Sequence, residues 1–126
     1  MWETYRDDVD FYVIYIREAH AIDSAVPLGG GNDSEFGAGV NPLMEDPVNL
    51  EERKQAAKTC ATKLALKPMP MLVDDMQDTA NHAYKAGPDR LYLVGKDGRI
   101  AYHGGPGPFA FSPDELEEAI RKELGR

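Results

Sequence analysis

Cysteine is almost absent from this sequence, since Cys60 is the only one among 126 residues. An intrachain disulfide and a Cys-X-X-Cys redox motif are both excluded, because each requires two thiols. A chain without disulfides suits a reducing compartment. The first eight residues, Met1 to Asp8, are too acidic for a signal peptide, so we expect a cytoplasmic protein.

Basic residues and long apolar runs are also scarce. The 14 Lys and Arg residues are outnumbered by 22 Asp and Glu residues, which gives a formal net charge of -8. No stripe of basic residues offsets this excess, whereas binding to nucleic acid depends on cationic contacts to phosphates. No run approaches the ~20 apolar residues that span a bilayer. We therefore expect neither nucleic acid nor a membrane as a partner.

What is present is an alternation of strand-like and helix-like segments, in a length that suits one domain over residues 1–126. Residues 9–16 (VDFYVIYI) are β-branched and aromatic, which predicts a strand buried on both faces. Residues 21–48 are rich in glycine and predict a flexible insertion. The other expected elements, in order, are a helix from Leu50 to the break at Lys67–Pro68, a strand at 71–73, a helix at 76–85, a hairpin of 90–94 and 100–103, and a helix opened by Ser112 and Pro113.

Local signals define where these helices begin and which faces they bury. Asn49 with Glu52, and Ser112 with Glu115, form capping boxes. Asp74 and Asp75 are expected to cap the helix that follows residues 71–73. The buried face expected for the helix after Asn49 consists of small and apolar residues, namely Leu50, Ala57, Cys60, Ala61 and Leu64. For the last helix it consists of Leu116, Ile120 and Leu124.

The order of the elements predicts an α/β protein of the thioredoxin-like three-layer type. A strand–helix–strand crossover is followed by an antiparallel hairpin and a C-terminal helix, which is the order in that fold. Pro70 directly precedes a buried strand, where the fold places a cis-proline next to its active site. We therefore expect a cis peptide bond before Pro70, and Pro70 beside the substrate.

The exit of the 9–16 strand carries the first candidates for chemistry. Glu18 and His20 follow the carboxyl end of the strand, where α/β proteins collect their ligands. Imidazole suits proton transfer because its unperturbed pKa lies near neutrality. The alternative is a histidine that only hydrogen-bonds the strand end, and spacing alone does not decide between the two.

Cys60 is the one candidate nucleophile of the chain. Its expected neighbours on the helix face are apolar, and burial among apolar groups raises the pKa of a thiol and makes it inert. We therefore expect Cys60 in the core, with a role as a resolving thiol as the alternative. His82 and His103 lack metal-ligand spacing to another His or Cys, so no metal and no cofactor is expected.

Three segments together resemble the iodothyronine deiodinase family, including its bacterial deiodinase-like members: DVDFYVIYIREAHAID, LVDDMQDTANHAYKAGPDRLYLV and GRIAYHGGPGPFAFSPDELEEAI. The resemblance implies a thioredoxin-like fold. It also implies that Glu18 and His20 pass protons to the substrate, with Tyr15 on the same strand matching a family tyrosine that could equally be core. Arg90 matches an arginine that holds the polar end of the substrate, the alternative being a salt bridge to Asp89 or Asp74.

The same resemblance implies a selenocysteine or cysteine nucleophile at the end of a strand before Val9. We therefore expect an N-terminally truncated domain that lacks the first strand, the nucleophile and most of the first helix, as a shortened or misread selenoprotein would. In the family this strand lies between residues 9–16 and 71–73. Without it, we expect those two strands either to pair directly or to leave an edge that a second copy fills in a homodimer.

The function that the resemblance implies is that of a deiodinase-like oxidoreductase. It would reduce a halogenated phenol or, as in bacterial relatives, a peroxide, with the help of a thiol reductant. The alternative is a non-catalytic thioredoxin-like module for binding or assembly. Where vertebrate members carry a second substrate-clamping histidine, this chain has Pro47 or its neighbours, which argues against thyroid hormone itself as the substrate.

Overall fold

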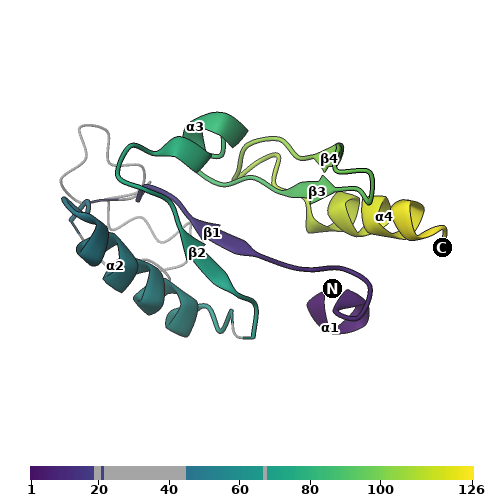
Figure 1. Cartoon of the computed structure of the whole chain (residues 1–126), viewed down its shortest axis with the longest axis horizontal. Helices are drawn as coiled ribbons and strands as arrows, with labels where there is room; N and C mark the ends of the chain where they lie inside the picture. The colour runs from purple at the N-terminus through teal and green to yellow at the C-terminus, as the bar shows by residue number, and fades with distance from the viewer. Residues whose placement is uncertain (19–20, 22–44, 67) are drawn as a thin grey trace. The chain divides into compact units, whose positions relative to one another are not determined.

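A computed structural model describes residues 1–18, 21, 45–66 and 68–126 as a mixture of helices and short strands (Figure 1). They form two compact units, one of residues 1–11 and 84–126 and the other of residues 12–83. Most of the insertion expected at 21–48 lies outside the described residues, as does His20. The single domain and the flexible insertion therefore stay predictions, whereas the α/β class is confirmed.

The unit of residues 12–83 is built on a parallel pair of strands, β1 (Val13–Tyr15) and β2 (Met71–Val73). Tyr15 lies opposite Val73, and the Asp74 amide donates a hydrogen bond of 2.9 Å to the Tyr15 carbonyl. The two strands thus pair directly, which confirms the first of the two arrangements expected from the sequence. β1 is shorter than residues 9–16, because its partner β2 offers only three residues for pairing. The prediction of burial on both faces is wrong, since Tyr12 and Ile14 are 61% and 43% exposed.

Pro70 corrects one prediction. The cis peptide bonds precede Pro88 and Pro108, and the bond before Pro70 is not among them. The Pro70 carbonyl accepts a hydrogen bond of 2.9 Å from the Val13 amide, so Pro70 opens the ladder of β1 and β2 as an ordinary strand-start proline. That position tolerates proline because its missing N–H is not needed by the ladder.

Helix α2 (Leu50–Lys63) packs against β2, and its N-terminus forms as expected. The Asn49 side chain accepts a hydrogen bond of 2.9 Å from the Glu52 amide, and the Glu52 carboxylate reaches back to the amide of Val48 at 3.0 Å. The predicted buried face is partly wrong, since Leu50 and Leu64 are 41% and 46% exposed.

The buried residues of α2 are Arg53, Ala56 and Ala57. The face differs from the expected one because the loop after β2 offers oxygen atoms to the Arg53 guanidinium, and two alanines beside it allow close approach. The buried face of α2 thus contains a charged residue, Arg53, whereas the expected face consisted only of small and apolar residues.

Helix α3 (Thr79–Tyr84) starts three residues later than residue 76 because a turn intervenes. The Asp78 amide donates to the Asp75 carbonyl at 3.0 Å, and Asp78 has φ of 56°, in the left-handed region. A helix cannot continue through this conformation, so it begins immediately afterwards.

The other unit combines α1 (Trp2–Tyr5), the antiparallel strands β3 (Tyr92–Val94) and β4 (Ile100–His103), and α4 (Pro113–Leu124). The predicted hairpin is confirmed, with Gly98 in its turn at φ of 78° and a register shift between Leu93 and Val94. Ser112 caps α4 as expected. The core consists of four buried residues, Tyr5, Leu93, Leu116 and Ile120, against which Leu124 also packs.

The glycine-rich segment 104–108 reverses the chain after β4, in agreement with the sequence. A methyl group added at Gly107 would lie 1.6 Å from an Asp89 carboxylate oxygen, and one at Gly105 would lie 2.4 Å from the Ala110 side chain. Close packing therefore leaves no room for a side chain at Gly105, whereas a side chain at Gly107 would require the Asp89 side chain to move. Among the described residues, no helix has the length and apolar character needed to cross a membrane.

Candidate functional site

Tyr15 and Glu18 form a hydrogen-bonded pair at the exit of β1. The Tyr15 hydroxyl donates to the Glu18 carboxylate at 2.7 Å, and both side chains are half-buried. Burial, followed by this hydrogen bond and the negative charge of Glu18, raises the pKa of Tyr15 far above its ordinary value. The phenol therefore stays protonated near neutral pH and acts as a hydrogen-bond donor, while Glu18 acts as the acceptor.

Cys60 on α2 belongs to the same electrostatic neighbourhood. The thiol is half-buried, and burial raises its pKa above the ordinary value, with the negative charge of Glu18 acting in the same direction. The thiolate is the nucleophilic form of cysteine, so this environment disfavours it. The structure thus brings together three residues singled out from the sequence, Tyr15, Glu18 and Cys60, and the pKa of the thiol is shifted in the direction that was expected. Cys60 is only half-buried and not in the core, and its reactivity stays a prediction.

The raised pKa of Cys60 leads to a measurable result. We expect the rate of Cys60 alkylation by iodoacetamide to rise with pH with a midpoint above that of a free thiol, because the raised pKa means that the thiolate forms only at higher pH. Glu18→Gln should move that midpoint to lower pH, because it removes the neighbouring negative charge. Glu51→Gln, an exposed acid of the same helix, should leave it in place. A midpoint below that of a free thiol would contradict this description.

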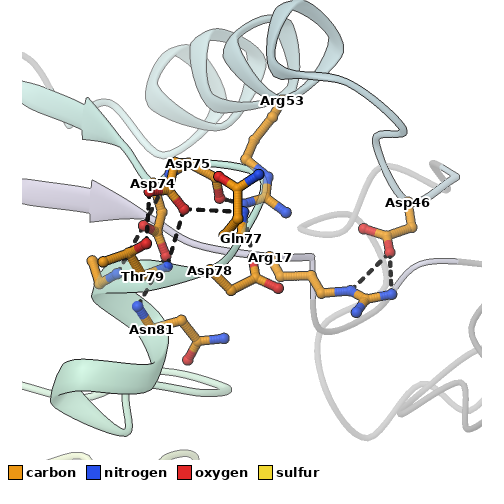
Figure 2. Close-up of polar contacts among 10 residues, drawn as sticks. Arg17, Asp46, Arg53, Asp74, Asp75, Gln77, Asp78, Thr79 and Asn81 are labelled. Atoms are coloured by element: carbon orange, nitrogen blue, oxygen red, sulfur yellow. Dashed lines mark hydrogen bonds and ion pairs between the residues drawn. The ribbon is translucent and has the colours of Figure 1, made fainter.

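Arg53 is the residue of this site that sequence reasoning missed. Its side chain is only 2% exposed. One guanidinium nitrogen, Nη1, donates both to the Asp75 carbonyl and to the Asp78 carboxylate, the latter at 2.8 Å, as Figure 2 shows. Two features of the sequence could have indicated the burial of Arg53. It lies one turn before Ala57 on the small-residue face of α2, and an acid-rich turn follows β2 later in the sequence.

The acid-rich turn itself is held by hydrogen bonds to backbone amides (Figure 2). The Asp74 carboxylate accepts three, from the amides of Asp75, Ala80 and Asn81, each at 2.9 Å. The Asp75 carboxylate accepts from the amides of Gln77 and Thr79 and from the Thr79 hydroxyl, and the hydroxyl is the first cause that lowers the pKa of Asp75. The predicted capping role of these two acids is confirmed.

An ion pair connects the residue after β1 that adjoins Glu18 with the segment before α2. Arg17, next to Glu18, pairs with Asp46 at 2.7 Å, on the segment that leads into α2 (Figure 2). The Arg17 side chain is 60% exposed, so solvent screens the pair and its contribution to stability is small.

Arg90 lies in the other unit, two residues after the cis-proline Pro88. Its side chain is partly buried, and its Nε atom is buried without a hydrogen-bond partner among the described residues. Within the same residues no ion pair of 4.0 Å or less joins Arg90 to Asp89, whereas Asp74 belongs to the unit of residues 12–83, so the salt bridge to Asp74 stays an open alternative. Its role as a substrate clamp stays a prediction.

The part of the chain that the structure describes contains no group of three or more His, Cys, Asp or Glu side chains placed to hold a metal ion. His103 at the end of β4 has its ring near that of Tyr92, with centroids 6.0 Å apart. His82 on α3 is exposed.

Comparison with known proteins identifies the relatives of this chain. The family model described as iodothyronine deiodinase matches residues 1–124. The chain is 35% identical over 126 residues to type II iodothyronine deiodinase of Fundulus heteroclitus, covering 98% of this chain and 44% of that protein. It is 34% identical over 119 residues to thyroxine 5-deiodinase of Ovis aries, covering 94% and 36%. These coverages mean that the chain spans less than half of the length of these relatives. By the match along almost its whole length, the chain belongs to the iodothyronine deiodinase family.

Proposed function

We propose that this chain takes part in the reductive removal of halogen from a halogenated phenol. Tyr15, Glu18 and His20 handle protons at the substrate, and Arg90 holds its polar end. The observation that carries the proposal is the hydrogen bond of 2.7 Å between the Tyr15 hydroxyl and the Glu18 carboxylate at the carboxyl end of β1. The relatives support it, because the named activities of those proteins are deiodinations.

The reaction needs a soft nucleophile as well as proton transfer. A selenol or thiol takes the iodine from the aryl carbon as the carbon–iodine bond breaks, and the carbon receives a proton, so that aryl iodide and selenol give arene and selenenyl iodide. Two molecules of thiol then reduce the selenenyl iodide, releasing iodide and a proton and forming a disulfide. Glu18, hydrogen-bonded to Tyr15, can relay the proton, since general acid–base groups act within hydrogen-bond distance.

Cys60 is a poor candidate for that nucleophile. Its pKa is raised, and the negative charge of Glu18 opposes the thiolate. No other cysteine is present in the 126 residues. We therefore infer that the selenol or thiol comes from outside these residues, while the chain supplies proton handling and binding.

The order of elements supports a thioredoxin-like arrangement for this function. Helix α2 connects the parallel strands β1 and β2, and the hairpin of β3 and β4 is followed by α4 (Figure 1). In such folds ligands bind outside the carboxyl ends of the strands, where Tyr15 and Glu18 lie. The proposal also includes three further predictions made from the sequence, namely a cytoplasmic location, a thiol reductant and a homodimer through a sheet edge.

The test supplies the nucleophile from solution. Iodide release from a diiodinated phenol is measured with dithiothreitol alone and with dithiothreitol plus a small aryl selenol, in the presence and absence of the chain. We expect acceleration only with the selenol present. Glu18→Gln should lower the acceleration by about 100-fold, within the range typical of a lost general acid or base. Tyr15→Phe should lower it less, and Cys60→Ser should leave it unchanged.

Two results would overturn the proposal. If the chain with dithiothreitol alone releases iodide and Cys60→Ser abolishes the release, Cys60 is the nucleophile. If the selenol reaction is the same with and without the chain, the chain does not handle protons in dehalogenation. That second result would favour the alternative of a binding or assembly module. The exposed side chains of Ile14 on β1, Leu72 on β2 and Tyr12 directly before β1 would then provide contacts.

A further inference from the structure

We propose that Arg53 is a positioning residue, which holds the Tyr15–Glu18 pair in its working geometry through the turn after β2. The inference rests on the proposed function, because it assigns a further residue to the same site. Arg53 lies on α2, whereas the pair lies on and just after β1, and the turn connects them.

Burying the charge of Arg53 costs free energy, which an apolar side chain that only filled space would not cost. At 2% exposure its charge has been removed from water, and a buried ion pair is often no more stable than apolar residues of the same volume. Its Nε atom is buried and has no hydrogen-bond partner among the described residues. What the guanidinium provides is a fixed geometry, because Nη1 holds two oxygen atoms of one turn, the Asp75 carbonyl and an Asp78 carboxylate oxygen.

The turn is connected directly to the catalytic candidates. The residue before Asp75 is Asp74, whose amide donates to the Tyr15 carbonyl at 2.9 Å. A displacement of the turn would therefore move the backbone of Tyr15. The Tyr15 hydroxyl is in turn only one hydrogen bond from Glu18, so an error in its position changes that bond. A short chain of contacts thus runs from Arg53 through Asp75 and Asp74 to Tyr15.

The charge of Arg53 acts on the same tyrosine. Burial and the Glu18 carboxylate raise the pKa of Tyr15, and the guanidinium opposes them. Arg53 therefore limits how strongly the phenol holds its proton, which matters for a group beside a proton acceptor. This charge effect is the smallest of those that act on the pKa of Tyr15, so the change expected on replacing Arg53 follows mainly from the contacts that hold the turn.

The experiment compares four variants of the full chain with tyrosine labelled with ¹³C at Cζ, a carbon whose chemical shift follows the hydrogen bonding of the phenol. Tyr15→Phe assigns the Tyr15 signal. Arg53→Met removes the charge and keeps most of the stem, and Arg53→Lys restores a charge without the planar fork. Lys54→Met is the matched control, because it removes a positive charge from the next residue of α2, where the side chain is 54% exposed.

We expect Arg53→Met to shift the Tyr15 Cζ signal, Arg53→Lys to return it part of the way, and Lys54→Met to leave it unchanged. In the selenol-supplemented assay, Arg53→Met should lower kcat by about 10-fold at unchanged KM, because proton transfer rather than binding is affected. An unshifted Tyr15 signal in Arg53→Met would overturn the inference. If Arg53→Met fails to fold, Asp78→Asn, which weakens the contact from the turn, should shift the Tyr15 signal, and an unshifted signal there would overturn it equally.

The spectroscopic result separates this inference from the proposed function. A shift of the Tyr15 signal without any dehalogenation by the wild-type chain would retain the positioning role of Arg53 and remove the proposed reaction. Acceleration of iodide release that is unchanged in Arg53→Met, with an unshifted Tyr15 signal, would remove the positioning role and retain the reaction.

Discussion

Asp74→Ala is expected to lower the free energy of unfolding by about 3 kcal/mol, because three backbone amides lose a charged acceptor at once. The carboxylate is 5% exposed and accepts from Asp75, Ala80 and Asn81. Each hydrogen bond to a charged group contributes ~1.5–3 kcal/mol, and water can replace part of the loss where the amides are only half-buried. Urea denaturation followed by circular dichroism measures the change.

Amide hydrogen exchange shows whether the loss of stability arises at the amides that donate to Asp74. In Asp74→Ala the amides of Ala80 and Asn81 should exchange faster than in the wild-type chain, because they lose the acceptor that protects them. Asp74→Asn keeps the size of the side chain and one acceptor oxygen, so its effect should be about half as large. A destabilisation below ~1 kcal/mol for Asp74→Ala would show that water satisfies all three amides.

Ile120→Ala is expected to lower the free energy of unfolding by about 3–4 kcal/mol, through a cavity in the unit that contains α4. Ile120 is 1% exposed and packs in the cluster with Tyr5, Leu93 and Leu116. The removed carbons lose their apolar surroundings, and the surrounding side chains close the space only in part. The loss should be seen in urea denaturation followed by the near-ultraviolet circular dichroism of the aromatic residues.

Ile120→Val provides the graded control for this prediction, since it removes a single methylene group and should cost about 1 kcal/mol. Glu118→Ala, on the exposed side of the same helix, should leave stability within ~0.5 kcal/mol of the wild-type chain. Equal effects of Ile120→Ala and Ile120→Val would mean that the site collapses around the smaller side chain, and the cavity argument would then be wrong.

The features predicted correctly from the sequence are those decided by neighbours along the chain. Asn49 and Glu52 are three residues apart, and their capping contacts involve only the first turn of α2. Asp97–Gly98 closes the hairpin because the turn needs a residue that adopts positive φ, and Gly98 has φ of 78°. Glu18 was a candidate from its place at the exit of a strand and Tyr15 from the family resemblance, whereas the hydrogen bond between them is a finding of the structure.

The features that were missed or wrong involve partners distant in the sequence. Arg53 contacts Asp75 and Asp78, 22 and 25 residues away. Its place one turn before Ala57 on the small-residue face of α2 is a weak local signal, which does not show that its charge will be buried. Leu50 and Leu64 are exposed because α2 turns the face with Arg53, Ala56 and Ala57 inward instead of the predicted face. Pro70 has the local pattern of a proline directly before a strand, which led to the wrong prediction of a cis peptide bond. In the structure its carbonyl accepts a hydrogen bond from the amide of Val13 on the other strand.

The sequence by itself therefore determined the family, the capped helix starts and the hairpin, because these depend on residue types and on contacts within a few residues. Only the tertiary structure decided which face of α2 is buried, which prolines are cis, and how Tyr15, Glu18, Cys60 and Arg53 influence one another. The physical reason is that burial and charge act through space. The pKa of a thiol and the cost of a buried guanidinium depend on which distant groups the fold brings beside them.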